Sequence, residues 1–276
     1  MSRVSVSRIH EYGVIGAGAL SKSLIGQLPH KSRQIGCVVG ASFRVASRMA
    51  NSLRAGQPAR SVDELDASPV ILFHAPAIQV PAMSLLLAEA RIQWKDKPLI
   101  FCDCEVPLAM MERFRSLGAS TALARQFGVV GTLVVEGTGP ALAHARRIAA
   151  DLRLRAIEIP GGSGGLFAAA QTLATSALTP LINRAADMLR ACGLRDKVAV
   201  QMASALFQQT VQEYGHSGRQ SWAWHVRQPD AEQIEAEIVA VSGPFQGLFR
   251  QLILSGFDDF EKHEAVAAQL RKNGTG

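Results

Sequence analysis

Val14-Ile-Gly16-Ala-Gly18-Ala-Leu-Ser21 is the stretch of sequence that decides the fold. An apolar segment over residues 12–15, typical of a β-strand, precedes it, and an amphipathic helical pattern over residues 20–28 follows it. Strand, Gly-x-Gly-x-x-small residue and helix, in this order, predict a loop that binds the diphosphate of a dinucleotide. The first glycine allows a tight turn, the second lets the diphosphate approach the backbone, and the third position needs a small residue, here a serine. The residues expected to bind the cofactor are Gly16, Ala17, Gly18, Ala19, Leu20 and Ser21.

The sequence after this loop favours a cofactor that carries an additional phosphate. No aspartate or glutamate occurs between Tyr12 and Val62. A site for NAD normally has a carboxylate at the end of the second strand, expected here over residues 35–40, and this carboxylate binds the ribose 2′-hydroxyl. This chain has Ser42 and Arg44 there instead, a hydroxyl and a guanidinium that would bind a 2′-phosphate. The sequence thus predicts NADP, with NAD less favoured and a solvated Arg44 as the alternative.

Composition and charge exclude several classes of protein. An apolar content of 48% over 276 residues, with 19% charged residues, is typical of an ordered globular protein of one large or two modest domains. The net charge is +6, but the basic residues are scattered and aromatic residues make up only 6%, which argues against a surface for nucleic acid. The four cysteines form no Cys-x-x-Cys pair, so neither a metal site nor a disulfide framework is predicted, and a cytoplasmic location is expected. Polar residues interrupt the apolar stretch 166–182, which predicts a buried helix rather than a membrane span.

The order of the predicted elements divides the chain in two. Strand and helix patterns alternate through the first 160 residues and predict a parallel sheet. Beyond the breaker cluster Pro160-Gly-Gly-Ser-Gly-Gly165 only long helical patterns occur. The cluster lacks the Lys-Ser/Thr pair of a Walker phosphate loop, so a hinge is the favoured interpretation. We therefore predict an α/β fold: a Rossmann domain with a doubly wound parallel sheet over residues 1–160, followed by an all-helical domain over residues 161–276.

This domain order resembles the 6-phosphogluconate-dehydrogenase-like superfamily, whose members include β-hydroxyacid dehydrogenases, pyrroline-5-carboxylate reductases and deazaflavin-dependent NADP reductases. Within it, the chain is similar to uncharacterised Rossmann-like proteins that carry the domain of unknown function 2520. The resemblance implies reduction of a small carbonyl or imine compound between the two domains, with Ala75 and Pro76 lining the cofactor. It rests on the glycine motif and, more loosely, on Phe73-His-Ala-Pro76, Val135-Glu-Gly137, Leu166-Phe-Ala-Ala-Ala170 and Arg227-Gln-Pro-Asp230.

The proton donors of these families are missing from this chain. β-Hydroxyacid dehydrogenases have a lysine on the long helix with an asparagine four residues later, where this chain has Ala168 and Thr172. The nearer relatives have a histidine at the position of Ala168, and their His-Pro after the sixth strand is replaced around Arg125-Gln126-Phe127. Either other residues supply the proton, or the chain binds a nucleotide without turnover.

Other side chains could supply the chemistry at the carboxyl ends of the strands, where open α/β sheets bind their ligands. His74 ends one strand, and an imidazole can donate a proton near neutral pH, although a role in lining the cofactor is the alternative. His225, in a loop with two tryptophans, is the second candidate acid, and Arg125 could bind a substrate carboxylate. Thr172 and Ser176 share a helix face that could line the substrate cleft, although hydroxyls bonded within their own helix are an equally good interpretation.

The sequence thus predicts an oxidoreductase that transfers hydride from NADPH to a small carbonyl or imine compound. The alternative is a non-catalytic dinucleotide-binding protein, a sensor, scaffold or partner subunit that has lost the proton donors. Both interpretations expect a small-molecule ligand and neither nucleic acid nor membrane as a partner. The resemblance also implies a homodimer formed through the helical domain.

Overall fold

The computed structural model describes residues 10–127, 131–218, 230–241, 243–260 and 264–273 of the chain. The chain divides into two compact units, Met1–Gln171 and Thr172–Gly276. The first unit holds a sheet covered by helices, and the described part of the second is helical, which confirms the predicted fold class. The division falls inside helix α7 (Gly164–Ala174), eleven residues beyond the predicted boundary at residue 160.

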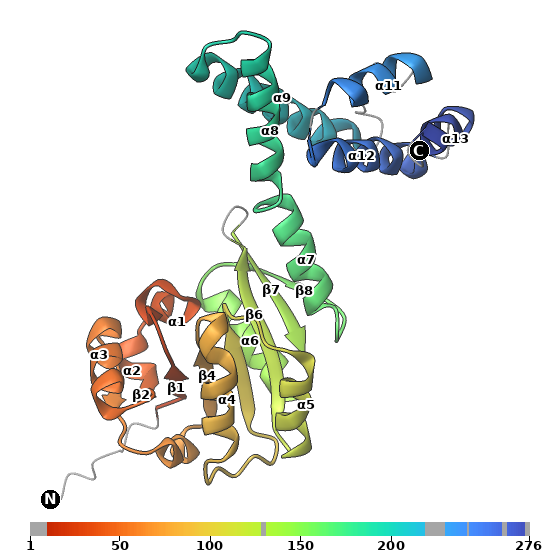
Figure 1. The fold of residues 1–276 in the computed structure, drawn as a ribbon. Coiled ribbons are helices and arrows are strands. Elements are labelled where there is room, and N and C mark those ends of the chain that lie inside the picture. The colour runs from red at the N-terminus through yellow and green to blue at the C-terminus, as the bar shows by residue number, and fades with distance from the viewer. Residues whose placement is uncertain (1–9, 128–130, 219–229, 242, 261–263, 274–276) are drawn as a thin grey trace, which may run out of the picture. The chain divides into compact units, whose positions relative to one another are not determined.

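The sheet contains eight strands in the order β3-β2-β1-β4-β5-β6-β7-β8 (Figure 1). From β1 the chain builds outward to β2 and β3 on one side, and then returns to place β4 on the other side of β1, as in a doubly wound sheet. The parallel pattern fails at one pair, because β6 and β7 are antiparallel. Only residues 128–131 connect these two strands, too few for the crossover that a parallel pair requires. The strands are β1 Tyr12–Gly16, β2 Ile35–Val39, β3 Gln57–Pro58, β4 Val70–His74, β5 Pro98–Cys102, β6 Ser120–Phe127, β7 Thr132–Gly137 and β8 Arg155–Glu158.

Helices pack on both faces of this sheet and enclose two buried apolar clusters. Helices α1, α3 and α6 contribute to the cluster on one face, and η2, α4 and α5 contribute to the cluster on the other. The central strands β1, β2, β4 and β5 are almost entirely apolar, as is usual for strands covered on both faces. The helices of this unit are η1 Leu20–Lys22, α1 Leu24–Gln27, α2 Lys31–Gln34, α3 Phe43–Leu53, η2 Val62–Ala67, η3 Ala77–Gln79, α4 Val80–Ala88, α5 Leu108–Ser116 and α6 Gly139–Asp151.

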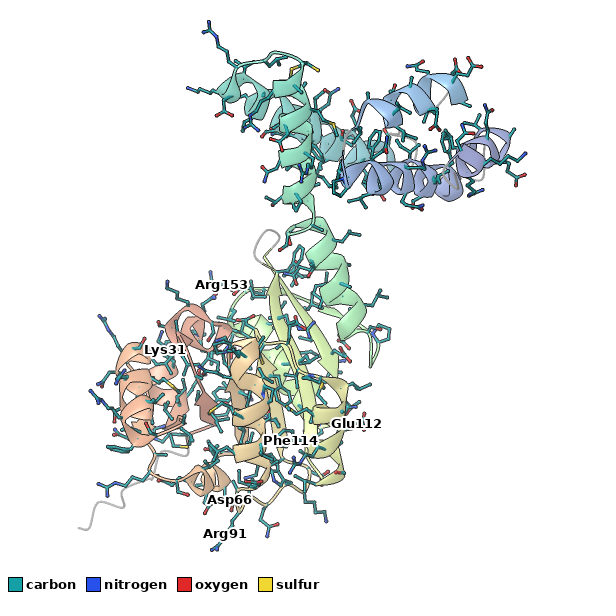
Figure 2. All side chains as sticks on the ribbon, viewed as in Figure 1. Lys31, Asp66, Arg91, Glu112, Phe114 and Arg153 are labelled. Carbon is teal, nitrogen blue, oxygen red and sulfur yellow. The ribbon has the colours of Figure 1, made fainter. Side chains whose placement is uncertain are left out.

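An aromatic chain anchors α5 to the sheet. The ring of Phe114, labelled in Figure 2, lies 5.3 Å from that of Trp94 and 6.0 Å from that of Phe101, which in turn lies 5.1 Å from Phe73. All four rings are buried, and tilted aromatic pairs at such distances add stability beyond their apolar area. These contacts hold the C-terminal half of α5 against β5, and Leu108 and Met111 in the preceding turns line a cavity described below.

The first helix is shorter than its apolar spacing predicts. Instead of one helix over residues 20–28, the structure has the short η1 followed by the four-residue α1. Between them Ser23 adopts an extended backbone, with ψ at 174°, and its hydroxyl donates to the carbonyl of Leu20 at 2.7 Å. A serine that bonds its local backbone in this way competes with a continuous helix. The apolar residues are nevertheless buried as the pattern predicts, namely Leu20, Leu24, Ile25 and Leu28.

The buried helix predicted over the stretch 166–182 is part of two helices, α7 and α8 (Leu178–Ala191), separated by a turn at residues 175–177. By length and composition alone, the stretch Gly164–Ala191 is apolar enough to cross a membrane, with a mean hydropathy of 1.3. The expectation that this stretch is buried is wrong for the single chain, because Leu166 is 76% exposed and Leu173 is 72% exposed. The other described helices of the second unit are α9 Asp196–Ser217, α11 Ala231–Ala240, α12 Phe245–Phe260 and α13 Glu264–Asn273.

Candidate cofactor-binding site

The glycine motif lies where β1 and β4 end side by side. Gly16 is the last residue of β1 and pairs with His74, the last residue of β4. A Cβ atom on Gly16 would lie 2.3 Å from the carbonyl oxygen of His74, so only glycine fits at this position. The amide of Ala17 donates to the same carbonyl at 2.9 Å. The turn thus sits at the point where the strand order reverses, which is where open α/β sheets bind their ligands.

Gly18 gives this turn its shape. Its φ of +80° lies in the left-handed region, and a Cβ atom there would lie 3.1 Å from the ring of Pro76. For residues other than glycine, a left-handed backbone costs about 1–2 kcal/mol. Gly18, Ala19 and Ser21 are exposed, so the loop is open to a ligand. The side chain of Leu20 is instead buried in the core, and its amide donates to the carbonyl of Gly18 at 3.2 Å.

Close packing after the loop depends on Gly26 rather than on Ser21. A Cβ atom on Gly26 would lie 2.3 Å from the carbonyl oxygen of Ser21. The small third residue of the motif therefore does not make the tight contact that the fingerprint assigns to it. Ser21 is exposed, and the close approach lies within the chain, between Ser21 and Gly26, a glycine that sequence reasoning passed over.

Asp103 occupies the N-terminal end of α1. Its Oδ2 accepts a hydrogen bond from the amide of Leu24 at 2.6 Å, and its Oδ1 accepts one from the amide of Gln126 at 2.9 Å. The predicted binding of a diphosphate at the start of a long first helix is therefore wrong in this detail, because a carboxylate already takes the first amide of α1. A diphosphate would have to be bound by the loop amides that precede η1.

The backbone of Asp103 also changes the orientation of its neighbours. Its φ of +49° is left-handed, and β5 ends one residue earlier, at Cys102. Strand alternation predicts Cys102 and Cys104 on the same face, but they belong to the apolar clusters of opposite faces. Burial raises the pKa of the Cys104 thiol to about 12, so this cysteine is a thiol rather than a thiolate at neutral pH.

A cavity of about 370 Å³ opens beside the glycine loop. The imidazole of His74 lines it, and its Nδ1 lies 2.8 Å from the carbonyl oxygen of Cys102. A carbonyl oxygen only accepts hydrogen bonds, so Nδ1 carries the hydrogen and Nε2 is the nitrogen that can take up or release a proton. The residues that line this cavity are Ala19, Lys22, Ser23, His74, Asp103 and Gln126. Of these, sequence reasoning identified only Ala19 and His74 as site residues.

The region predicted to bind the 2′-phosphate lies at the end of β2. Ser42 is the N-cap of α3, where its hydroxyl oxygen accepts from the amide of Val45 at 3.3 Å, and Arg44 is exposed in the first turn. This first turn contains no acidic residue. The guanidinium of Arg60 lies 5.5 Å from the ring centroid of Phe43, so a second exposed cation lies close to the first turn of α3.

Ala75 and Pro76 follow β4 directly and complete the edge of the loop. Ala75 is 1% exposed, so almost none of this residue is accessible. Pro76 is exposed, and its ring lies 3.1 Å from the position that a Cβ atom on Gly18 would occupy. Their predicted roles in binding the cofactor stay predictions.

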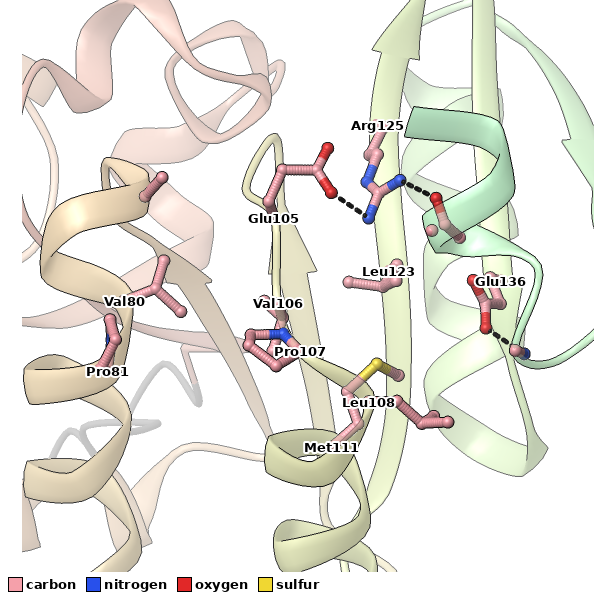
Figure 3. Close-up of a pocket in the computed structure, with 14 residues that line it drawn as sticks. Val80, Pro81, Glu105, Val106, Pro107, Leu108, Met111, Leu123, Arg125 and Glu136 are labelled. Carbon is pink, nitrogen blue, oxygen red and sulfur yellow. Dashed lines mark hydrogen bonds and ion pairs between the residues drawn. The ribbon is translucent and has the colours of Figure 1, made fainter. Parts of the chain in front are cut away.

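Arg125 lies in a second cavity, of about 490 Å³, whose lining also includes Glu105 and Glu136 (Figure 3). Its guanidinium lies 3.0 Å from the carboxylate of Glu105 and donates to the carbonyl of Gly164 at 3.1 Å. A substrate carboxylate could bind Arg125 as predicted only by displacing Glu105. Sequence reasoning missed both glutamates, although Glu105 follows a strand end and could have been found there.

The remaining candidate residues are not brought into either cavity. Thr172 and Ser176 are exposed, and the turn at residues 175–177 separates them instead of leaving them on one helix face. His225 lies outside the described residues. Within the described residues, no group of three or more histidine, cysteine, aspartate or glutamate side chains is placed to hold a metal ion.

Comparisons with known proteins identify the fold. No family model matches the sequence, and no curated protein matches it. An imine reductase from Aspergillus terreus, solved in complex with NADPH4, matches with a TM-score of 0.66 and 16% identity over 90% of this chain and 94% of that chain. An imine reductase variant from Myxococcus stipitatus, in complex with NAD+, matches with a TM-score of 0.56 and 17% identity over 96% and 94% of the two chains. A pyrroline-5-carboxylate reductase from Coxiella burnetii matches with a TM-score of 0.54 and 10% identity over 96% and 97%.

One of these neighbours is a pyrroline-5-carboxylate reductase, a kind of protein that the sequence resembles, and the likeness in fold extends over nearly the full length of each chain. The narrower resemblance to proteins with the domain of unknown function 2520 is not confirmed. At identities below 20% the likeness concerns the fold: this chain has the fold of Rossmann-type reductases that continue into a helical C-terminal region.

Proposed function

We propose that this protein is an NADP-dependent oxidoreductase that transfers hydride to a small carbonyl or imine compound. The observation that carries the proposal is the turn at Gly16 and Gly18, pressed against His74 and Pro76 at the switch point of the sheet. An exposed Arg44 at the end of the neighbouring strand, with no carboxylate in the first turn of α3, supports NADP over NAD. The solved reductases with this fold, two of them with bound nicotinamide dinucleotides, add further support.

The residues present fit such a cofactor. Backbone amides of the exposed loop would bind the diphosphate, and the guanidinium of Arg44 would pair with the 2′-phosphate. The hydroxyl of Ser42 can share this task, because its oxygen accepts from Val45 while its own hydrogen stays available to donate. The bound cofactor would supply the hydride.

His74 is the proton donor that the geometry favours. Its Nδ1 hydrogen is engaged by Cys102, so the ring orientation and the tautomer are held, and Nε2 is left for chemistry. The imidazole lines the cavity beside the glycine loop, where a substrate would lie against the cofactor. His225, in the tryptophan-rich loop, remains a predicted second candidate.

We infer that the protein forms a homodimer through its helical unit. Helix α9 exposes a series of large apolar side chains, which a monomer rarely leaves in water. A second copy of the chain would cover them, and light scattering should then give about twice the chain mass of 29.5 kDa. The exposed residues of α9 are Val198, Val200, Met202, Leu206, Val211 and Tyr214.

All four cysteines are free thiols, which fits a reducing cytosol.

Titration of tryptophan fluorescence with NADPH and with NADH tests the proposal. The variant Arg44→Ala should bind NADPH about 10–150-fold more weakly, the equivalent of about 1.5–3 kcal/mol for a hydrogen bond to a charged group, and its affinity for NADH should be unchanged. Arg91→Ala, which removes an exposed arginine outside both cavities, is the matched control. Equal losses of affinity for NADPH and NADH would reject the role of Arg44. A wild-type chain that binds neither cofactor at millimolar concentration would reject the proposed function.

A second variant separates binding from turnover. His74→Gln should leave NADPH affinity within about twofold and lower imine or ketone reduction by about 10²–10⁴-fold, the usual contribution of a general acid. A cofactor-binding protein that reduces no carbonyl or imine compound would instead support the non-catalytic alternative.

A further inference from the structure

We propose that the second cavity of the Rossmann unit binds a protonated amine with a compact apolar body. This cavity, called the Glu136 cavity below, has a volume of about 490 Å³ and lies entirely within residues 77–165. The proposal names a substrate class for the proposed function and rests on that function only for turnover, since amine binding can be measured without the cofactor. The residues that carry the argument are Leu108, Met111, Leu123, Arg125, Glu105 and Glu136 (Figure 3).

The positive charge in this cavity already has a carboxylate partner, although the Nε atom of Arg125 is buried without a hydrogen-bond partner among the described residues. Arg125 is 8% exposed, and its guanidinium pairs with Glu105 at 3.0 Å and donates to the carbonyl of Gly164 at 3.1 Å. Figure 3 shows the guanidinium between these two partners. An anionic ligand would therefore have to compete with a carboxylate that belongs to the protein.

The negative charge of Glu136 is not neutralised in the same way. Glu136 is 3% exposed, and its Oε1 accepts a hydrogen bond from the amide of Gly162 at 2.6 Å. Its Oε2 is buried without a hydrogen-bond partner among the described residues. Burying a carboxylate is unfavourable unless a donor or a cation compensates it. The formal charges of Arg125, Glu105 and Glu136 sum to −1. Nη2 of Arg125 and Oε2 of Glu136 lie 3.5 and 2.5 Å from the same Cβ position on Gly164, but the guanidinium forms its ion pair with Glu105, and Oε2 has no hydrogen bond.

The backbone around Glu136 is shaped to leave this oxygen in place. A Cβ atom on Gly164 would lie 2.5 Å from Oε2, so any other residue at position 164 would displace the carboxylate. The remaining walls are mainly apolar, from Leu108 and Met111 of α5 and Leu123 of β6. Apolar walls with a few convergent polar groups, in a volume between about 300 and 1,000 Å³, are typical of small-molecule sites. A cationic nitrogen for Glu136 and a hydrocarbon body for the walls satisfy both features.

The position of the cavity suits the proposed reaction. Gln126 lines the cavity beside the glycine loop, and its neighbour Arg125 lines the Glu136 cavity. Likewise, Asp103 lines the cavity beside the glycine loop and Glu105 lines the Glu136 cavity. Both cavities therefore open at the carboxyl edge of the sheet. A protonated imine is a cation and its reduction product is an amine, so one anionic cavity would suit substrate and product alike.

Three probes with the same ring and different charge test the proposal. Cyclohexylamine is a cation at pH 7, as alkyl amines are, whereas cyclohexanol is neutral and cyclohexanecarboxylate is an anion. Ligand-observed NMR or calorimetry on the purified full chain should give the tightest binding for the amine. Glu136→Gln keeps the shape and the bond to Gly162 but removes the charge, and should weaken amine binding about tenfold or more without changing cyclohexanol.

Two further variants control this experiment. Glu112→Gln removes an exposed carboxylate of α5, labelled in Figure 2, that pairs with Arg115 outside the cavity, and should change nothing. Gly164→Ala should weaken binding of the amine, as Glu136→Gln does, because the new Cβ atom would displace Oε2 of Glu136. Circular dichroism and thermal melting of each variant show whether it is folded, independently of the cofactor. If the wild-type chain does not bind NADPH but binds the amine, the proposed function is rejected and the amine site is supported.

Several outcomes would overturn the proposal. Tighter binding of the carboxylate would assign the cavity to Arg125 and an anion. Equal binding of all three probes would show that charge plays no part in it. No binding of the amine would show that the cavity is not an amine site, and an unchanged amine affinity in Glu136→Gln would place the amine elsewhere.

Discussion

Asp103 ties together three segments of the candidate site, and its replacement gives the sharpest prediction. Its carboxylate accepts the amide of Leu24, at the start of α1, and the amide of Gln126, in β6. Its own backbone is left-handed, with φ at +49°. Asparagine, like aspartate, adopts the left-handed backbone. Asp103→Asn therefore weakens the hydrogen bonds of the carboxylate without straining the backbone.

The magnitude follows from the two hydrogen bonds. Asparagine keeps one carbonyl oxygen and turns its NH2 group toward the other amide, so one bond to a charged acceptor is lost at a cost of about 1.5–3 kcal/mol. Asp103→Gly loses both bonds but adopts a positive φ freely. Asp103→Ala loses both bonds and also pays about 1–2 kcal/mol for the left-handed backbone. The expected order of stability is therefore Asp, Asn, Gly and then Ala.

The assay must report on the first unit, because a chain with two compact units need not unfold in one step. Urea unfolding followed by hydrogen exchange of peptides that contain residues 20–28 and 120–127 meets this need. Protection of the Leu24 and Gln126 amides should fall first in Asp103→Asn. Wild-type stability and unchanged protection in Asp103→Asn would refute the reasoning, as would an alanine variant more stable than the glycine variant.

Three further predictions concern other parts of the chain. Gly16→Ala places a Cβ atom 2.3 Å from the carbonyl of His74; it should destabilise the chain by about 1–3 kcal/mol and weaken NADPH binding, and a variant with wild-type melting would contradict the tight turn. Burial raises the pKa of Tyr12 from 10.0 to about 12, so its neutral form contributes about 3 kcal/mol below pH 10, which is lost as the pH rises toward 12. The variant Tyr12→Phe should therefore lose less stability than the wild type between pH 10 and 12. An identical dependence of the free energy of unfolding on pH in the two proteins would argue against this. The hydrogen bonds of Arg250, one at 2.9 Å, lower the pKa of Glu235 below its usual 4.5, so this pair stabilises the second unit above pH 4.5 and is lost as the pH falls through the depressed pKa. Glu235→Gln should cost about 1–3 kcal/mol at pH 7 by denaturant unfolding, and little at pH 3; equal losses at the two pH values would show that charge is not the cause.

Local sequence patterns predict most of the first unit. Apolar runs such as Val70–His74 mark buried strands, and the spacing after the glycine motif predicts which residues are buried. The motif itself predicts the switch-point turn, because Gly16 and Gly18 meet steric demands that only glycine satisfies. Such features depend on residues close together in the chain, and a single sequence therefore reveals them.

Patterns fail where a distant residue or a short connection intervenes. The first helix breaks at Ser23, and the carboxylate that takes the first amide of α1 comes from Asp103, 79 residues away. Strands β6 and β7 pair antiparallel because the four residues between them are too few for a crossover. Neither strand's own sequence distinguishes it from a parallel strand.

The sequence by itself determined the glycine turn after β1, most of the strands and the helices of the described second half, because steric limits and apolar periodicity are local properties. Only the tertiary structure decided which charges meet. It pairs Arg125 with Glu105, leaves one oxygen of Glu136 without a partner and sets the tautomer of His74 through Cys102. These contacts join strand ends that lie 20 or more residues apart in the chain, and the order of strands in the sheet brings them to one edge.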